Sequence, residues 1–80
     1  MNDDRRKTIK LAIREMEQAR ERLETAQTEE QEAYDNMPEA FQQGERGEKA
    51  QEAMDALQEA MDSLDTAIES AQNALGEECQ

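Results

Sequence analysis

The residue types that most often carry out catalysis are scarce in this chain. Its 80 residues include no histidine and one cysteine, Cys79, next to the end of the sequence. Ser63 and Ser70 fall on the polar side of a predicted helix, with no motif that places a general base beside them. Gly44 and Gly47 stand in a Gly-Glu-Arg-Gly context without the following Lys-Ser or Lys-Thr of a phosphate-binding loop. We therefore expect a non-enzymatic protein without a cofactor.

Metal binding is equally poorly supported, and the acidic residues suggest a different role. Helical bundles that hold paired metal ions combine Glu with Glu-x-x-His on facing helices, and histidine is missing here. Glu52, Asp55, Glu59, Asp62 and Glu69 recur at spacings that place them on the outer face of one helix. The simplest interpretation is a solvated face. The alternative is an acidic inhibitor, whose carboxylates imitate nucleic-acid phosphates and occupy a basic groove of another protein.

A second candidate site lies where the chain turns. Arg46 and Lys49 are the only basic residues after the first 22. Tyr34, Asn36 and Gln42 add an aromatic ring and two amides in the same region, a mixture suited to stacking and hydrogen bonding on a planar ligand. We predict that these five residues bind a small anionic ligand. The alternative is structural, with the cations in ion pairs and the aromatic rings closing the end of a bundle.

Two long helices must position these residues. Asn2 is suited to cap a helix, with two acidic residues in its first turn, whereas Pro38 and the glycines after it interrupt the helical pattern. The predicted segments are a helix over about 3–35, a loop with a short helical turn over 36–47, a helix over about 48–75 and a tail over 76–80. Matched lengths and a short connection predict one all-α domain, an antiparallel helical hairpin.

Apolar residues on the second helix form three columns at seven-residue spacing. Ala50 and Leu57 begin one column and continue it every seven residues, and Ala53 begins a second. We expect these two columns to face the first helix, with large residues opposite small ones and facing residue numbers adding to 83. The third column then remains for another subunit, and the predicted oligomer interface is Ile13, Met54, Met61, Ile68 and Leu75. Because soluble monomers avoid such apolar strips, we expect a dimeric four-helix bundle or a larger homo-oligomer; the alternative is a monomer with methionines under long charged side chains.

The net charge of -12 is unevenly distributed. Residues 1–22 contain seven basic and five acidic residues, whereas residues 23–80 contain two basic and sixteen acidic ones. We expect no direct binding of nucleic acid and no membrane binding, and regard a basic protein as a suitable partner. The predicted register places the bases at the start of the first helix beside acids at the end of the second. No apolar run is long enough for a signal peptide or a membrane span, so we expect a soluble cytoplasmic protein.

The loop string resembles a known group of proteins. From Tyr34 it reads Tyr-Asp-Asn-Met-Pro-Glu-Ala-Phe-Gln-Gln-Gly-Glu-Arg-Gly-Glu-Lys, followed by Ala-Met-Asp-Ala-Leu repeats. In this it resembles small acidic helical-hairpin proteins of phages and prophages of Gram-positive bacteria. The resemblance implies an accessory protein in the host cytoplasm. Such a protein could sequester an anionic, nucleotide-like host defence signal near the loop; the alternatives are the acidic inhibitor and a purely structural coiled-coil module.

Overall fold

Local sequence signals define the ends of the helices. The computed structural model describes residues 2–76 and contains α1 (Asp3–Asp35), α2 (Glu39–Gln42) and α3 (Glu45–Leu75). The Asn2 side chain caps α1 by accepting a hydrogen bond of 2.9 Å from the backbone N–H of Arg5. Gly76 ends α3 in the left-handed conformation, with φ of 73°, which a residue without Cβ adopts at no steric cost. α3 begins before the predicted residue 48, because Gly44 in extended conformation is its N-cap.

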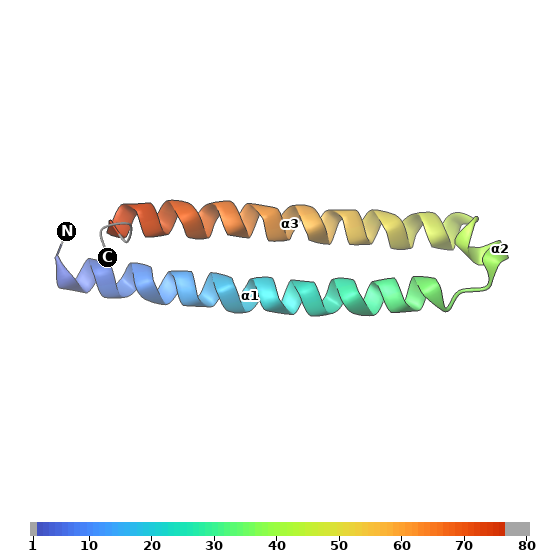
Figure 1. The fold of residues 1–80 in the computed structure, drawn as a ribbon, viewed down its shortest axis with the longest axis horizontal. Coiled ribbons are helices and arrows are strands. Elements are labelled where there is room, and N and C mark those ends of the chain that lie inside the picture. The colour runs from blue at the N-terminus through green and yellow to red at the C-terminus, as the bar shows by residue number, and fades with distance from the viewer. Residues whose placement is uncertain (1, 77–80) are drawn as a thin grey trace.

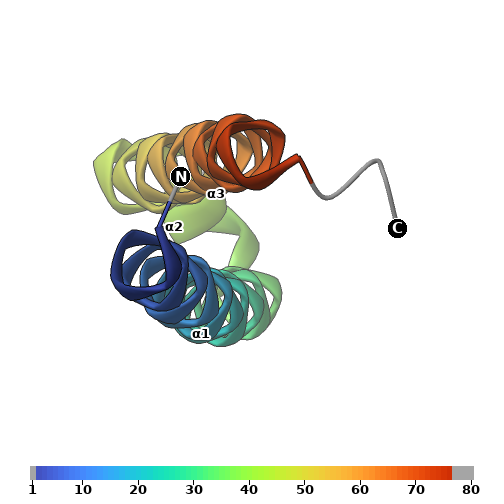
Figure 2. The same cartoon turned by 90° about the vertical axis from the view of Figure 1, so that its left-hand side faces the viewer.

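The two long helices form an antiparallel hairpin. Figure 1 shows α1 and α3 side by side along their whole length, with α2 at the turn. The molecule measures 58 × 18 × 14 Å, and in the end-on view of Figure 2 it is a single layer two helices wide. Within residues 2–76, no helix is both long enough and apolar enough to cross a membrane. The structure confirms the predicted all-helical hairpin.

The helices pack along a narrow seam, which we define as the residues of α1 and α3 that are buried or half-buried between them. Met61 is the most buried large side chain, with 2% of its surface exposed. Ile13, Ala50 and Leu75 are also buried. The half-buried apolar members are Ile9, Met16, Ala19, Leu23, Met54, Leu57, Leu64, Ile68 and Ala71. Nearly all seam residues repeat in two columns per helix at seven-residue spacing, the pattern of a coiled coil.

The structure corrects the predicted assignment of the three α3 columns. The alanine column at Ala53, Ala60, Ala67 and Ala74 is exposed. The column reserved for another subunit (Met54, Met61, Ile68 and Leu75) instead lies within the hairpin, as does Ile13 on α1. The physical reason is area: turning methionine, isoleucine and leucine toward α1 removes more apolar surface from water than turning methyl groups there. A fully covered Met61 has no surface left to offer a second chain.

The cross-helix hydrogen bonds lie on both sides of the predicted register, in which facing residue numbers add to 83. The pairs Arg20 with Asp65, Gln27 with Gln58, and Tyr34 with Gln51 add to 85. The bonds from Arg6 to the Leu75 carbonyl and from Gln27 to the Met54 carbonyl add to 81.

The predicted row of ion pairs between the start of α1 and the end of α3 does not form. Within residues 2–76, Arg20 to Asp65 is the only ion pair that joins the two helices. The basic segment 5–14 lies beside residues 70–76, which carry no charged side chain. Arg6 instead donates a hydrogen bond of 3.2 Å to the backbone carbonyl of Leu75. Among residues 2–76, the basic side chains at this end of α1 are therefore not paired with acids across the two helices.

Close backbone contact requires glycine where α3 begins. A Cβ added to Gly47 would lie 1.9 Å from the carbonyl oxygen of Gln42, at the end of α2. Gly47 is buried at the first turn of α3. The short helix α2 is thereby held against α3, which fixes the geometry of the turn.

We predict that Met61→Ala destabilises the hairpin strongly, because it removes the most buried large side chain. The free energy of unfolding, measured by urea titration with circular dichroism, should fall by about 2–5 kcal/mol. Leu11→Ala is the matched control, since Leu11 is 54% exposed on the outside of α1 and its loss should change stability by no more than about 0.5 kcal/mol. Equal losses in both variants would contradict this seam.

Candidate functional site

The loop end joins two of the predicted ligand-binding residues directly. The side-chain amide of Gln42 donates to the backbone carbonyl of Tyr34 at 2.8 Å. The Tyr34 hydroxyl accepts from the side-chain amide of Gln51 on α3, at 3.0 Å. Both Tyr34 and Gln42 are half-buried. Their polar groups are thus already engaged in connecting α1 to the turn and to α3.

The other predicted ligand-binding residues point to separate partners. The Arg46 guanidinium lies over the Phe41 ring, 5.0 Å from its centroid, and Phe41 is 46% exposed. Lys49 forms an exposed ion pair of 3.3 Å with Glu45, one turn earlier on the same helix. Asn36 is exposed and closes α1, with its backbone N–H bonded to the Glu32 carbonyl at 3.0 Å. The structure therefore does not gather the five residues around one cavity.

Acids outnumber bases around the turn. Between residues 35 and 49, four carboxylates accompany the two cations. Asp35, Glu39, Glu45 and Glu48 are all exposed. A small anion approaching Arg46 and Lys49 thus meets a local net charge of -2. The four carboxylates make anion binding at the loop less favourable than it would be beside the two cations alone.

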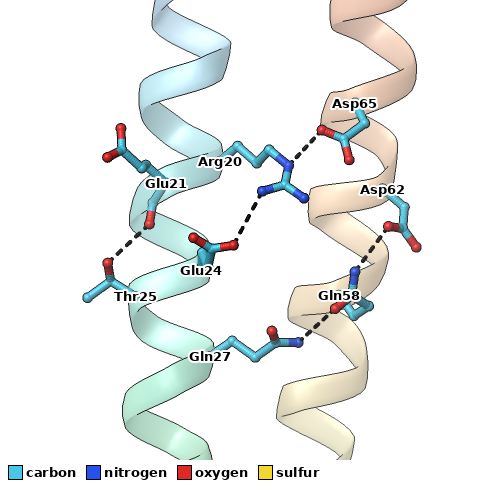
Figure 3. A network of polar contacts seen from close by, with 8 residues as sticks. All are labelled: Arg20, Glu21, Glu24, Thr25, Gln27, Gln58, Asp62 and Asp65. Carbon is cyan, nitrogen blue, oxygen red and sulfur yellow. Dashed lines mark hydrogen bonds and ion pairs between the residues drawn. The ribbon is translucent and has the colours of Figure 1, made fainter.

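A polar groove, absent from the sequence-based prediction, runs between the long helices on one side of the hairpin. Its volume is about 530 Å³, and a row of glutamines forms much of its wall. It is lined by Gln27, Thr28, Gln31, Glu32, Gln51, Met54, Asp55 and Gln58. None of the predicted ligand-binding residues lines it. Figure 3 shows part of this side, with Gln27 donating to Gln58 at 3.2 Å and Gln58 donating to Asp62 at 3.1 Å.

Arg20 is the electrostatic centre of the same side. Its Nε donates to Asp65 at 2.6 Å, and its Nη1 lies 3.6 Å from Glu24 on its own helix (Figure 3). The hydrogen bond and then the charge of Asp65 raise the pKa of Arg20 above its usual value. Because the pKa is raised, the stabilisation that charged Arg20 gives the folded state is present at lower pH. It is lost only as the pH rises through that pKa, far above neutrality. The contact therefore persists at physiological pH.

The outer side of α3 carries a line of carboxylates that we call the acidic ridge. Its members are Glu48, Glu52, Asp55, Glu59, Asp62 and Glu69. All six are exposed, and within residues 2–76 none of them forms an ion pair. At 1.5 Å per residue the ridge extends over about 32 Å. Because it lies on one continuous helix, the spacing of its charges is fixed by the backbone.

The sequence did contain a signal for the polar contacts. Arg6, Arg20 and Gln27 occupy the same seven-residue column as Ile13 and Tyr34. Polar residues in a seam column of a coiled coil indicate cross-helix hydrogen bonds that specify register. All three make such bonds: Arg6 to the Leu75 carbonyl, Arg20 to a carboxylate, and Gln27 to the Met54 carbonyl at 3.1 Å.

The described part of the chain offers no preformed metal or buried polar site. Within residues 2–76, no group of three or more acidic or cysteine side chains is placed to hold a metal ion. Every buried side-chain nitrogen and oxygen in that range has a hydrogen-bond partner. Cys79 lies outside the described residues.

No family model, curated protein or solved structure matches this chain.

We predict that filling the polar seam positions with leucine stabilises the hairpin but makes its register less specific. Arg20→Leu combined with Gln27→Leu should raise the urea midpoint, because apolar seam residues usually stabilise more than partly desolvated polar ones. Light scattering should then show a broader mass distribution, since the polar contacts that select one register are gone.

Arg22→Leu combined with Gln18→Leu provides the matched control. Both positions are exposed outside the seam, and the pair makes the same change in charge and in leucine content. The control should not raise the midpoint. A lower midpoint for the seam variant would show that the polar contacts contribute more than the packing they displace.

Proposed function

We propose that this protein is a non-enzymatic accessory protein that binds a basic surface of a partner protein through the acidic ridge. The observation that carries the proposal is the row of six exposed carboxylates on one helix, none of them ion-paired within residues 2–76. Carboxylates without intramolecular cations remain available to an external basic surface. Such a charge pattern speeds the diffusional encounter with a basic protein and disfavours acidic partners.

The shape of the molecule supports the same proposal. A basic groove that normally receives nucleic-acid phosphates requires a long, narrow and rigid acidic body. The hairpin is 58 Å long and at most 18 Å across, and the ridge follows its long axis. From Glu48 to Asp62, successive carboxylates are three or four residues apart, which gives a spacing of about 5 Å along the helix; Glu69 follows one further step of seven residues, about 10 Å. The protein would act by occupying the groove, as a nucleic-acid-mimicking inhibitor.

Assembly and origin form part of the proposal. Two hairpins forming a four-helix bundle would stiffen the ridge and present two copies of it. The loop string supports a phage or prophage origin, with the host cytoplasm as the place of action. In that setting the partner is a basic host protein.

We predict that neutralising the ridge weakens binding to a basic probe far more than neutralising α1. The ridge variant combines Glu52→Gln, Asp55→Asn, Glu59→Gln and Asp62→Asn. Its affinity for a short all-lysine peptide at low salt, measured calorimetrically, should fall at least about tenfold, because each lost pair contributes up to about 1 kcal/mol. Binding by the unchanged protein should fall steeply as salt is added.

The control carries the same charge change on the other helix: Glu15→Gln, Glu17→Gln, Glu21→Gln and Glu29→Gln, all at exposed positions. Its affinity should fall less than about threefold if binding is localised to the ridge. Equal losses in both variants would show that the peptide responds to net charge alone, and the ridge would not be the binding surface.

A second candidate function is sequestration of a small anionic, nucleotide-like ligand at the loop end. It is favoured by the exposed Phe41 ring beneath the Arg46 guanidinium, which together offer a flat stacking surface beside a positive charge. The surrounding carboxylates weigh against it, so we place it second.

This candidate predicts that adenosine triphosphate, used as the probe, binds the unchanged chain. Arg46→Ala combined with Lys49→Ala should weaken that binding at least about tenfold while the oligomer mass stays unchanged. Lys7→Ala combined with Lys10→Ala removes the same charge at the opposite end and should retain binding. Absence of binding to the unchanged protein, or equal loss in the control, would contradict the candidate.

A further inference from the structure

One side of the hairpin is lined by small apolar residues on both helices. Alanines recur every seven residues on α1 and again on α3. We call this surface the alanine face; its members are Ala12, Ala19, Ala26 and Ala33 on α1, and Ala53, Ala60, Ala67 and Ala74 on α3. Seven of the eight are exposed and Ala19 is half-buried. This surface has no long polar side chain within either column.

The two alanine columns belong to the same side of the molecule. The contacts from Arg20, Gln27 and Tyr34 to α3 all cross the opposite side, the side of the polar groove. On each helix the alanine column adjoins the other seam column, the one that contains Leu23 on α1 and Leu64 on α3. In an antiparallel coiled coil these flanking columns lie next to each other across the seam.

Large apolar side chains between the alanine columns are only partly covered. Ile9, Met16 and Leu23 on α1 are half-buried, as are Leu57 and Leu64 on α3. In the seam column on the polar side, Ile13, Met61 and Leu75 are buried, whereas Met54 and Ile68 are half-buried. On the alanine face the five large side chains keep part of their surface exposed, and the neighbouring methyl groups are too short to shield it.

The chain exposes more surface than a compact monomer of the same mass. The chain exposes 6009 Å². A compact monomer of 9.1 kDa exposes about 4,900 Å², so the surplus is about 1,100 Å². A specific protein interface typically removes about 800 Å² from each partner. The surplus is therefore of the size that one such interface removes from one partner.

Charge selects both the partner and its direction. Segment 5–14 contains five bases and no acid, and within residues 2–76 none of those bases forms an ion pair. At the other end of α1, segment 29–35 contains four acids and no base. Two copies stacked with opposite directions bring each basic segment beside the acidic segment of the other copy. Two copies stacked in the same direction would bring like charges together at both ends.

We propose that a second copy of this chain docks on the alanine face with opposite direction, α1 against α1 and α3 against α3, to form a four-helix bundle. The proposal rests on the assembly included in the proposed function and names the surface that forms it. The alanine columns are symmetric about their midpoints, which places Ala12 near the partner's Ala33 and Ala53 near the partner's Ala74. Small side chains allow the helices to approach to about 8 Å. The acidic ridge stays on the outside.

Mass in solution tests the surface. Light scattering should give twice the chain mass for the unchanged protein and the mass of one chain for Ala26→Glu combined with Ala60→Glu, with helical circular dichroism retained. Both substitutions are at exposed positions, so the hairpin itself tolerates them. Gln18→Glu combined with Gln72→Glu adds the same charge away from the alanine face and should remain dimeric. A monomeric unchanged protein, a dimeric alanine-face variant or a monomeric control would each overturn the proposal.

Disulfide trapping tests the direction. In a Cys79→Ser background, chains carrying Ala12→Cys are mixed with chains carrying Ala33→Cys and oxidised. The mixed pair should crosslink efficiently, whereas mixing Ala12→Cys with Ala74→Cys should not. Efficient crosslinking of the second pair alone would show that the copies stack in the same direction, and would overturn the arrangement.

The monomeric alanine-face variant also separates this proposal from the proposed function. Each of its acidic ridges is intact, so it should still bind the all-lysine peptide within about threefold of the unchanged protein. Loss of dimerisation with retained peptide binding supports the two as independent surfaces. A dimer that binds no peptide would overturn the ridge function and leave the docking surface standing.

Discussion

The packing of α1 against α3 along a two-column seam is the constraint on which the rest of this structure depends. With no third layer to cover it, each long helix can bury only the stripe that meets the other (Figure 2). The chain places large apolar side chains on this stripe, and Met61, Leu75 and Ile13 are buried there. How far another residue lies around the helix axis from that stripe decides which surface of the hairpin it belongs to.

Polar residues inside the seam make the packing specific. Arg20 and Gln27 occupy positions where leucine would bury more apolar area, yet each reaches a defined oxygen on α3 (Figure 3). Shifting one helix by a turn would separate these partners. Because Arg20 remains charged at physiological pH, the selection of register does not depend on pH in that range. The seam thus combines modest burial with a unique alignment.

The seam leaves two unlike sides and an acidic back. On one side long glutamine and arginine side chains bridge the helices. On the other, alanines leave residues such as Leu23 and Leu64 half-buried. The back of α3 carries the six exposed carboxylates of the acidic ridge. With this division, the proposed self-association and the proposed basic partner use different surfaces.

The sequence by itself determined the secondary structure, because Asn2, Pro38 and Gly76 mark helix ends by local chemistry. The seven-residue repeat on both long helices also indicates a hairpin. It did not determine which of three α3 columns faces α1, because all three are apolar and share one period. That choice depends on how much area each column buries across both helices at once, which only the tertiary structure decides. The predicted loop residues are not gathered around one cavity for a related reason: Arg46 and Lys49 are three residues apart in sequence, but in the fold Arg46 lies over a ring and Lys49 pairs with a carboxylate.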